Sequence, residues 1–248
     1  MSKSIHIFGF HSVESLLRTN PESVIKVFIL NNRKDKRVNE LVNTLTNQNI
    51  AFSSVDKNDL DRIAKGEIHQ GVISEVILPP LLNEESLFKS ISENSLKPLI
   101  LILDSIQDPR NLGACLRSAN AAGVNYVIIN KDGSAPINAV VHKTSAGAIN
   151  SLKIFHVTNL SRTIKEMQKR GIWVIGLDGN SKSTIYDIDL TDATAVVMGS
   201  EGKGIRKLIK KTCDQTVTIP MSGNIESLNV SVATGIALFE SKRQRESS

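Results

Sequence analysis

Residues 98–130 read PLILILDSIQDPRNLGACLRSANAAGVNYVIIN, and they contain the clearest signals of secondary structure in the chain. Leu99 to Asp104 and Val124 to Asn130 are continuous apolar runs, which are typical of strands buried on both faces of a parallel sheet. The segment between them has the signals of a helix, with Asp108 as the N-cap and Gly123 at the end. The stretch therefore predicts a strand, a crossover helix and a second, parallel strand.

Three further apolar runs continue this pattern toward the C-terminus: Trp173 to Asp178, Ala195 to Gly199 and Thr216 to Met221. Segments with helical spacing separate them. Residues 98–248 are therefore predicted to form an α/β domain whose parallel sheet is covered by helices on both faces.

The N-terminal part of the chain predicts a separate, small α/β unit over residues 1–78. Its expected elements are strands at 24–30, 50–55 and 71–78 and a helix at 35–48. Residues 79–97 begin with a Pro pair, contain acidic and Ser residues, and stop before Pro98. This composition is typical of a linker with little helix, so we expect the domain boundary there.

Composition and charge narrow the class of protein. Apolar residues make up 40% of the chain, as in ordinary globular proteins, and no stretch is long and apolar enough to span a membrane. The N-terminus has no long apolar segment, and the two cysteines are isolated, so we expect a cytoplasmic location. The chain has 30 Lys and Arg against 25 Asp and Glu, a net charge of +5. Residues 98–248 contribute 18 basic and 13 acidic side chains, an excess that fits either a polyanion partner or simple solubility.

Three polar clusters follow predicted strands in the C-terminal domain. They read DPRNLGACLRSA (108–119), VVMGSEGKGIR (196–206) and TIPMSGNIESLNVSVATGIALFE (218–240). The carboxyl ends of parallel strands are where open α/β sheets bind ligands. Each cluster alone is also compatible with an ordinary cap, turn or loop, and no G-x-G-x-x-G follows the first strand, which argues against a dinucleotide enzyme. The five histidines have no ligand spacing, so no metal is expected.

Basic residues gather after the second cluster, and we call them the basic stripe: Lys203, Arg206, Lys207, Lys210 and Lys211. Their spacing predicts that all five lie on one side of a helix, where they suit phosphate binding or form a solvated face. Arg110 and Arg117, seven residues apart, are likewise expected on one side of the first helix.

Together, the three clusters resemble the three signature motifs of the SpoU (TrmH) family of RNA ribose 2′-O-methyltransferases, in the SPOUT class. They occur in the family order between residues 104 and 240. The N-terminal unit, including IFGFHSVESLL at 7–17, resembles the substrate-binding domain of the branch that methylates a guanosine ribose in 23S ribosomal RNA.

The resemblance implies a C-terminal trefoil knot, a homodimer and S-adenosylmethionine as methyl donor. By motif position, it implies that the cofactor is contacted by Gly199, Ile219, Pro220, Met221 and Leu228. The catalytic group implied is Arg117, with Asn111, Glu201, Ser227 and Asn229 as positioning residues. Arg117 is expected to stabilise a forming alkoxide, because a guanidinium does not lose its proton in proteins.

Two other functions remain open from the sequence: a ribose methyltransferase acting on transfer RNA, and a non-catalytic ribosome-assembly protein with the same fold. In the N-terminal unit, the expected RNA-binding patch is Arg33, Lys34, Lys36 and Arg37, which is equally compatible with a solubilising turn.

Overall fold

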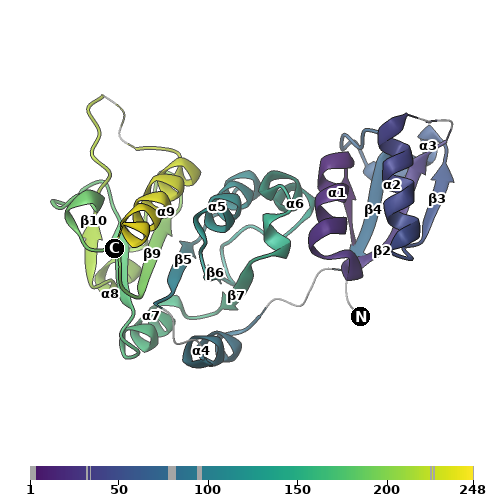
Figure 1. Cartoon of the computed structure of the whole chain (residues 1–248). Coiled ribbons are helices and arrows are strands. Elements are labelled where there is room, and N and C mark those ends of the chain that lie inside the picture. Colours follow the sequence, from purple (N-terminus) through teal and green to yellow (C-terminus); the bar gives the residue numbers. More distant parts are fainter. Residues whose placement is uncertain are drawn as a thin grey trace. The chain divides into compact units, whose positions relative to one another are not determined.

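The computed structural model describes residues 4–31, 33, 35–77, 82–93, 97–223, 225 and 227–247. The chain forms two compact units, one made of residues 1–80 with 137–151 and the other of residues 81–136 with 152–248. Figure 1 shows the helices and strands of both units. Among the described residues, no helix has the length and apolar character needed to cross a membrane.

The first unit has a mixed four-stranded sheet in the order β1-β4-β2-β3. Strand β4 runs antiparallel to both β1 and β2, whereas β2 and β3 are parallel. The strands are β1 (Ser4–Phe8), β2 (Val24–Leu30), β3 (Phe52–Val55) and β4 (Val72–Ile77), and the helices are α1 (Phe10–Thr19), α2 (Lys36–Asn47), α3 (Lys57–Ala64) and α6 (Ala139–Ser145). Two short 3₁₀ turns, η1 (Pro21–Ser23) and η2 (Ala148–Asn150), complete the unit.

Both faces of this sheet are covered, because successive side chains of a strand point to opposite faces. Val27 and Val72 pack with residues of α1 and α2. Ile73 packs with Leu60 of α3 on the other face. The expected helix at 35–48 and the strands at 24–30 and 50–55 are confirmed. The strand at 71–78 is confirmed as far as Ile77, since Leu78 lies outside the described residues.

The second unit has a six-stranded sheet in the order β10-β8-β9-β5-β6-β7, and every neighbouring pair is parallel. Its strands are β5 (Leu99–Asp104), β6 (Tyr126–Asn130), β7 (Lys153–Val157), β8 (Trp173–Leu177), β9 (Thr194–Gly199) and β10 (Gln215–Val217). The helices are α4 (Glu84–Glu93), α5 (Pro109–Ala122), α7 (Leu160–Gln168), α8 (Lys207–Thr212) and α9 (Val230–Glu246), with the 3₁₀ turn η3 (Ile185–Asp187). The predicted parallel α/β architecture is confirmed.

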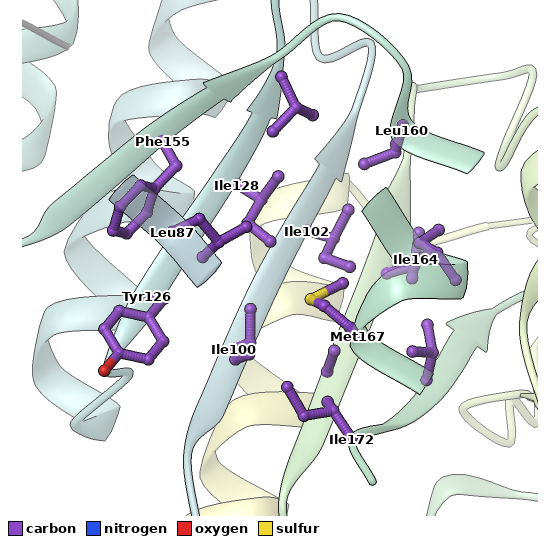
Figure 2. Close-up of a cluster of buried hydrophobic side chains, with 14 of the residues drawn as sticks. Leu87, Ile100, Ile102, Tyr126, Ile128, Phe155, Leu160, Ile164, Met167 and Ile172 are labelled. Carbon is purple, nitrogen blue, oxygen red and sulfur yellow. The ribbon is translucent and has the colours of Figure 1, made fainter. Parts of the chain in front are cut away.

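One face of this sheet packs against α4, α7 and α8. Figure 2 shows side chains of this core, including Leu87 of α4, Ile102 of β5 and Met167 of α7, all fully buried. Alternate residues of the central strands, such as Leu101 and Val196, are also fully buried. Helix α9 packs against β9 and against α5, so both faces of the central strands are covered.

Three features differ from the sequence-based expectations. The region expected as a linker contains α4, whose Leu87 is part of the core, so these residues pack on the second unit. Strand β7 was not predicted, because Lys153–Val157 is short and has polar residues among its apolar ones. Strand β10 ends at Val217, before Pro220, which lacks the N–H that a longer strand would need there.

Candidate active site at the carboxyl ends of the central strands

The first two polar clusters meet where β5 and β9 end. Asp104 and Gly199 are the last residues of these strands, and they are register partners in the sheet. Because the strands are parallel and their faces are covered, the loops at this edge are the part of the sheet that is open to a ligand.

Residues 199–206, which we call the glycine loop, turn back over the end of β9. Ser200 and Gly204 exchange two backbone hydrogen bonds of 3.1 and 2.9 Å. A Cβ atom at position 199 would lie 2.0 Å from the carbonyl carbon of Gly204, so any side chain there forces the loop away from the strand. Gly202 and Gly204 have positive φ values of 74° and 64°, which glycine adopts without strain.

Helix α5 begins at this edge. The Asp108 side chain accepts a hydrogen bond of 2.7 Å from the backbone N–H of Arg110, and Gly123 ends the helix in the left-handed conformation, as predicted. This start places Asn111 in the first turn of the helix, near the end of β5.

Asn229 links the three clusters. Its Nδ2 donates to Oδ1 of Asn111, at 3.1 Å, and to Oε1 of Glu201. Its Oδ1 accepts from the backbone N–H of Ser231 and so caps α9. The structure thus brings together residues from positions 111, 201 and 229, which we call the Asn229 group, and each of them was singled out in the sequence.

One hydrogen-bond donor and one acceptor of this group remain available. Neither Nδ2 of Asn111 nor Oε2 of Glu201 has a hydrogen-bond partner among the described residues. Both residues are accessible to solvent, so these atoms can bind a ligand.

The third cluster contributes free backbone groups. The N–H groups of Ile219, Met221 and Leu228 donate no hydrogen bond to any residue that the structure describes. Pro220 and Met221 are exposed, while Ile219 and Leu228 are half-buried. Of the same loop, Asn224 and Glu226 lie outside the described residues. The segment offers apolar side chains together with backbone donors, which is the combination that small-molecule sites use.

Arg117 and Ser227 are not part of the Asn229 group. Both are exposed, and neither side chain has a hydrogen bond or ion pair with the residues described here. Arg117 follows Asn111 by six residues on α5, about 9 Å along the axis and on another side of the helix. Its guanidinium is therefore free to bind another molecule.

The basic stripe is not one helical face, and this prediction was wrong. Helix α8 begins only at Lys207, because Arg206 has an extended backbone. The Arg206 side chain forms an ion pair with the fully buried Asp104, and Lys210 forms one with Asp178. Only Lys203, Lys207 and Lys211 are exposed without a partner among the described residues.

Asp104 was not predicted from the sequence as a site residue, although its side chain holds the glycine loop at this edge of the sheet. Its carboxylate accepts hydrogen bonds from the backbone N–H of Arg206, at 2.9 Å, and from its Nε, at 2.7 Å. The available signal was a carboxylate that directly ends a run of five buried apolar residues, since a buried charge requires a partner.

The two cysteines do not contribute nucleophiles. Burial raises the pKa of Cys115 to about 11, and its Sγ lies 3.4 Å from the hydroxyl of Thr234. Burial also raises the pKa of Cys213 to about 12. Both thiols are therefore protonated at neutral pH. In the described part of the chain, no three His, Cys, Asp or Glu side chains are grouped so as to hold a metal ion.

Comparison with known proteins finds a family model for each of the two main parts of the chain. The model of the SpoU rRNA Methylase family matches residues 98–239, and the model of the RNA 2′-O ribose methyltransferase substrate-binding domain matches residues 6–80. The chain is 47% identical over 243 residues to the 23S rRNA (guanosine-2′-O-)-methyltransferase RlmB of Haemophilus ducreyi, covering 98% of both proteins. It is 44% identical over 239 residues to RlmB of Escherichia coli, covering 96% of this chain and 98% of that protein.

A solved structure shows the same fold. The SpoU methyltransferase AviRb from Streptomyces viridochromogenes, in complex with the cofactor AdoMet, aligns with a TM-score of 0.80 at 22% identity, over 99% of this chain and 92% of that one. The parallel sheet, the linked clusters at its carboxyl edge and the matches along nearly the whole chain lead to one assignment: the chain belongs to the SpoU rRNA methylase family.

Proposed function

We propose that this protein transfers a methyl group from S-adenosylmethionine to the ribose 2′-hydroxyl of a guanosine in 23S ribosomal RNA. The observation that carries this proposal is the 43–47% identity, over nearly the whole chain, to relatives named for that reaction. The hydrogen-bonded Asn229 group supports an active enzyme over a non-catalytic assembly protein, because all three of its residues are present and in contact. Identity that extends over both units favours ribosomal over transfer RNA.

The cofactor fits the glycine loop and the segment after β10. Bound there, S-adenosylmethionine supplies an electrophilic methyl group. We assign Gly199, Ile219, Pro220, Met221 and Leu228 to its binding. Gly199 lets the loop lie close over β9, and the free N–H groups of the third cluster can pair with a nucleobase.

The residues of the chain must orient the ribose hydroxyl and accept its proton, because the hydroxyl attacks the methyl carbon in line. Asn111 and Ser227 offer polar groups for positioning the nucleotide. The proton acceptor is a phosphate of the substrate or a carboxylate, and Glu201 is the carboxylate of the Asn229 group. Asn229 holds Oε1 of Glu201 and leaves Oε2 open to a proton.

Arg117 is assigned to the phosphate of the target nucleotide and to the forming alkoxide. A guanidinium presents donors in a fixed plane, which suits phosphate and developing negative charge. The exposure of Arg117, and its lack of a partner among the described residues, leave it free for this role.

We assign selection of the RNA to residues 1–78, with residues 79–97 connecting them to the methyltransferase domain, 98–248. Within the expected RNA-binding patch, Arg33 pairs with Asp35, and Arg37 pairs with Glu14. Both guanidinium groups also lie over the ring of Phe10, at 4.7 and 4.9 Å. Lys34 lies outside the described residues. Lys36, whose side chain is 91% exposed, is the patch residue best placed to bind phosphate.

We also propose a homodimer with a C-terminal trefoil knot, as the family resemblance implies. Val232 and Phe239 are apolar residues of α9, yet they are 51% and 47% exposed. They lie two turns apart on one side of the helix, and an apolar stripe of this kind supports contact with a second copy of the chain. Because the proposed substrate is ribosomal RNA, we assign the reaction to the cytoplasm.

Ribosomal RNA from cells that lack the gene tests the function. We expect one guanosine of 23S RNA to lose its ribose methylation, and a plasmid copy of the gene to restore it. Mapping of 2′-O-methyl groups by their resistance to alkaline cleavage gives the measurement. An unchanged 23S pattern, together with a lost methyl group in transfer RNA, would favour the alternative substrate.

Gly199→Ala tests the cofactor site. We expect at least tenfold weaker S-adenosylmethionine binding by calorimetry, because the new Cβ collides with the backbone of Gly204. Gly235→Ala in α9 is the matched control, since a Cβ there meets only Oγ of Ser118, at an ordinary contact distance of 3.7 Å, and it should bind the cofactor normally. Equal affinities of the two variants would remove the glycine loop from the site.

Arg117→Ala should lower kcat about a hundredfold, which corresponds to about 3 kcal/mol, while cofactor affinity stays unchanged. Arg117→Lys should restore little, because an ammonium cannot reproduce the planar donors. Arg110→Ala, on the same helix and also exposed, should change the KM for RNA and leave kcat intact. Near-normal turnover by Arg117→Ala would assign the alkoxide to another residue.

Lys36→Glu should weaken rRNA binding several-fold and reduce its salt dependence by about one phosphate contact. Lys89→Glu is the matched control, because Lys89 is also exposed and also faces a glutamate four residues later, at 3.9 Å against 3.8 Å for Lys36. Filter binding at several salt concentrations measures both. Identical curves for the two variants would exclude Lys36 from the RNA contact.

A further inference from the structure

Asp104 binds both ends of the glycine loop to the central strand. The residue is 0% exposed and pairs in register with Gly199, where the loop begins. Its Oδ2 accepts from the backbone N–H of Arg206, where the loop ends. Its Oδ1 accepts from Nε of the same residue, at 2.7 Å, and lies 2.6 Å from Nη2 in the ion pair.

This ion pair occupies the guanidinium group of Arg206. Two of its three guanidinium nitrogens point to one carboxylate, although its position among Lys203, Lys207 and Lys211 indicates a role in phosphate binding. A buried carboxylate without such a partner is strongly unfavourable, so the ion pair persists as long as Asp104 stays buried. The pair also determines the path of residues 200–205, because both ends of this segment are held at one point.

Glu201 lies within that segment. Its Oε1 accepts from Asn229, which in turn contacts Asn111. The Asp104–Arg206 pair therefore affects the position of Glu201, because both belong to or hold the glycine loop.

We propose that Asp104 and Arg206 are positioning residues for cofactor binding, which hold the glycine loop in its binding conformation, and that Arg206 makes no contact with RNA. The inference rests on the proposed cofactor site. The spacing of the basic residues had suggested phosphate binding for Arg206, and the proposal replaces that role.

Arg206→Gln and Lys207→Gln, made in the full chain, separate the two roles. Both remove one charge from neighbouring positions, but only Arg206 has the carboxylate partner. For Arg206→Gln we expect at least tenfold weaker S-adenosylmethionine binding by calorimetry and a raised KM for the cofactor. We also expect rRNA affinity and its salt slope to stay within twofold of the original protein. Lys207→Gln should bind the cofactor normally.

Asp104→Asn and the double variant Asp104→Asn/Arg206→Gln complete a double-mutant cycle. Because the two residues act as one unit, the double variant should lose no more cofactor affinity than the weaker-binding single variant. Arg206→Gln leaves a buried charge unpaired, and if that variant fails to fold, the double variant, which removes both charges, gives the cofactor measurement. Arg206→Lys keeps the charge and should restore cofactor affinity only in part.

Three results would decide against the proposal. Normal cofactor affinity in Arg206→Gln, or in the folded double variant, overturns the positioning role alone. A smaller salt slope in Arg206→Gln with unchanged cofactor affinity makes Arg206 an RNA contact. If the original protein does not bind S-adenosylmethionine at all, the proposed cofactor site fails first, and the positioning role fails with it.

Discussion

Burial of β5 and β9 on both faces is the constraint on which the second unit depends. Each residue of these two strands is buried, and helices cover both sides of the sheet. A ligand can therefore approach only past the strand ends, where backbone pairing stops. The glycine loop, the start of α5 and the segment after β10 all lie at that edge, so one packing requirement concentrates the chemistry in one place.

Much of this architecture could be predicted because it follows from local patterns. Residues 99–103 of β5 and 195–198 of β9 are apolar throughout, which is typical of strands buried on both faces, and Asp108 and Gly123 mark the ends of α5 by their capping chemistry. Strand β7 lacked such a pattern, since Lys153 and His156 interrupt its apolar residues. Helix α4 was missed because its acidic residues and the prolines that flank it in the sequence resemble a linker, whereas its role is fixed by Leu87, which packs against strands distant in the sequence.

In the candidate site, too, some features could be predicted from the sequence and others could not. Asn111, Glu201 and Asn229 could be selected from their motifs, but their hydrogen bonds join residues that are 118 and 28 positions apart, and no spacing rule predicts such contacts. Arg206 shows most clearly that spacing along the chain does not predict the partner of a side chain. Helical spacing placed it among exposed lysines, while Asp104, more than a hundred residues earlier, determines where its side chain points. The exposure of Val232 and Phe239 likewise depends on how α9 packs on α5, which the composition of α9 does not reveal.

Asn229 also sets a time order for the assembly of the site. The chain is synthesised from its N-terminus, and β5, α5 and the glycine loop all precede the residue that connects them. The sheet can therefore begin to pack while the chain is still being made, but the Asn229 group can form only after Asn229 itself has been synthesised. A nascent chain that is interrupted before α9 contains most of the core and none of the completed site.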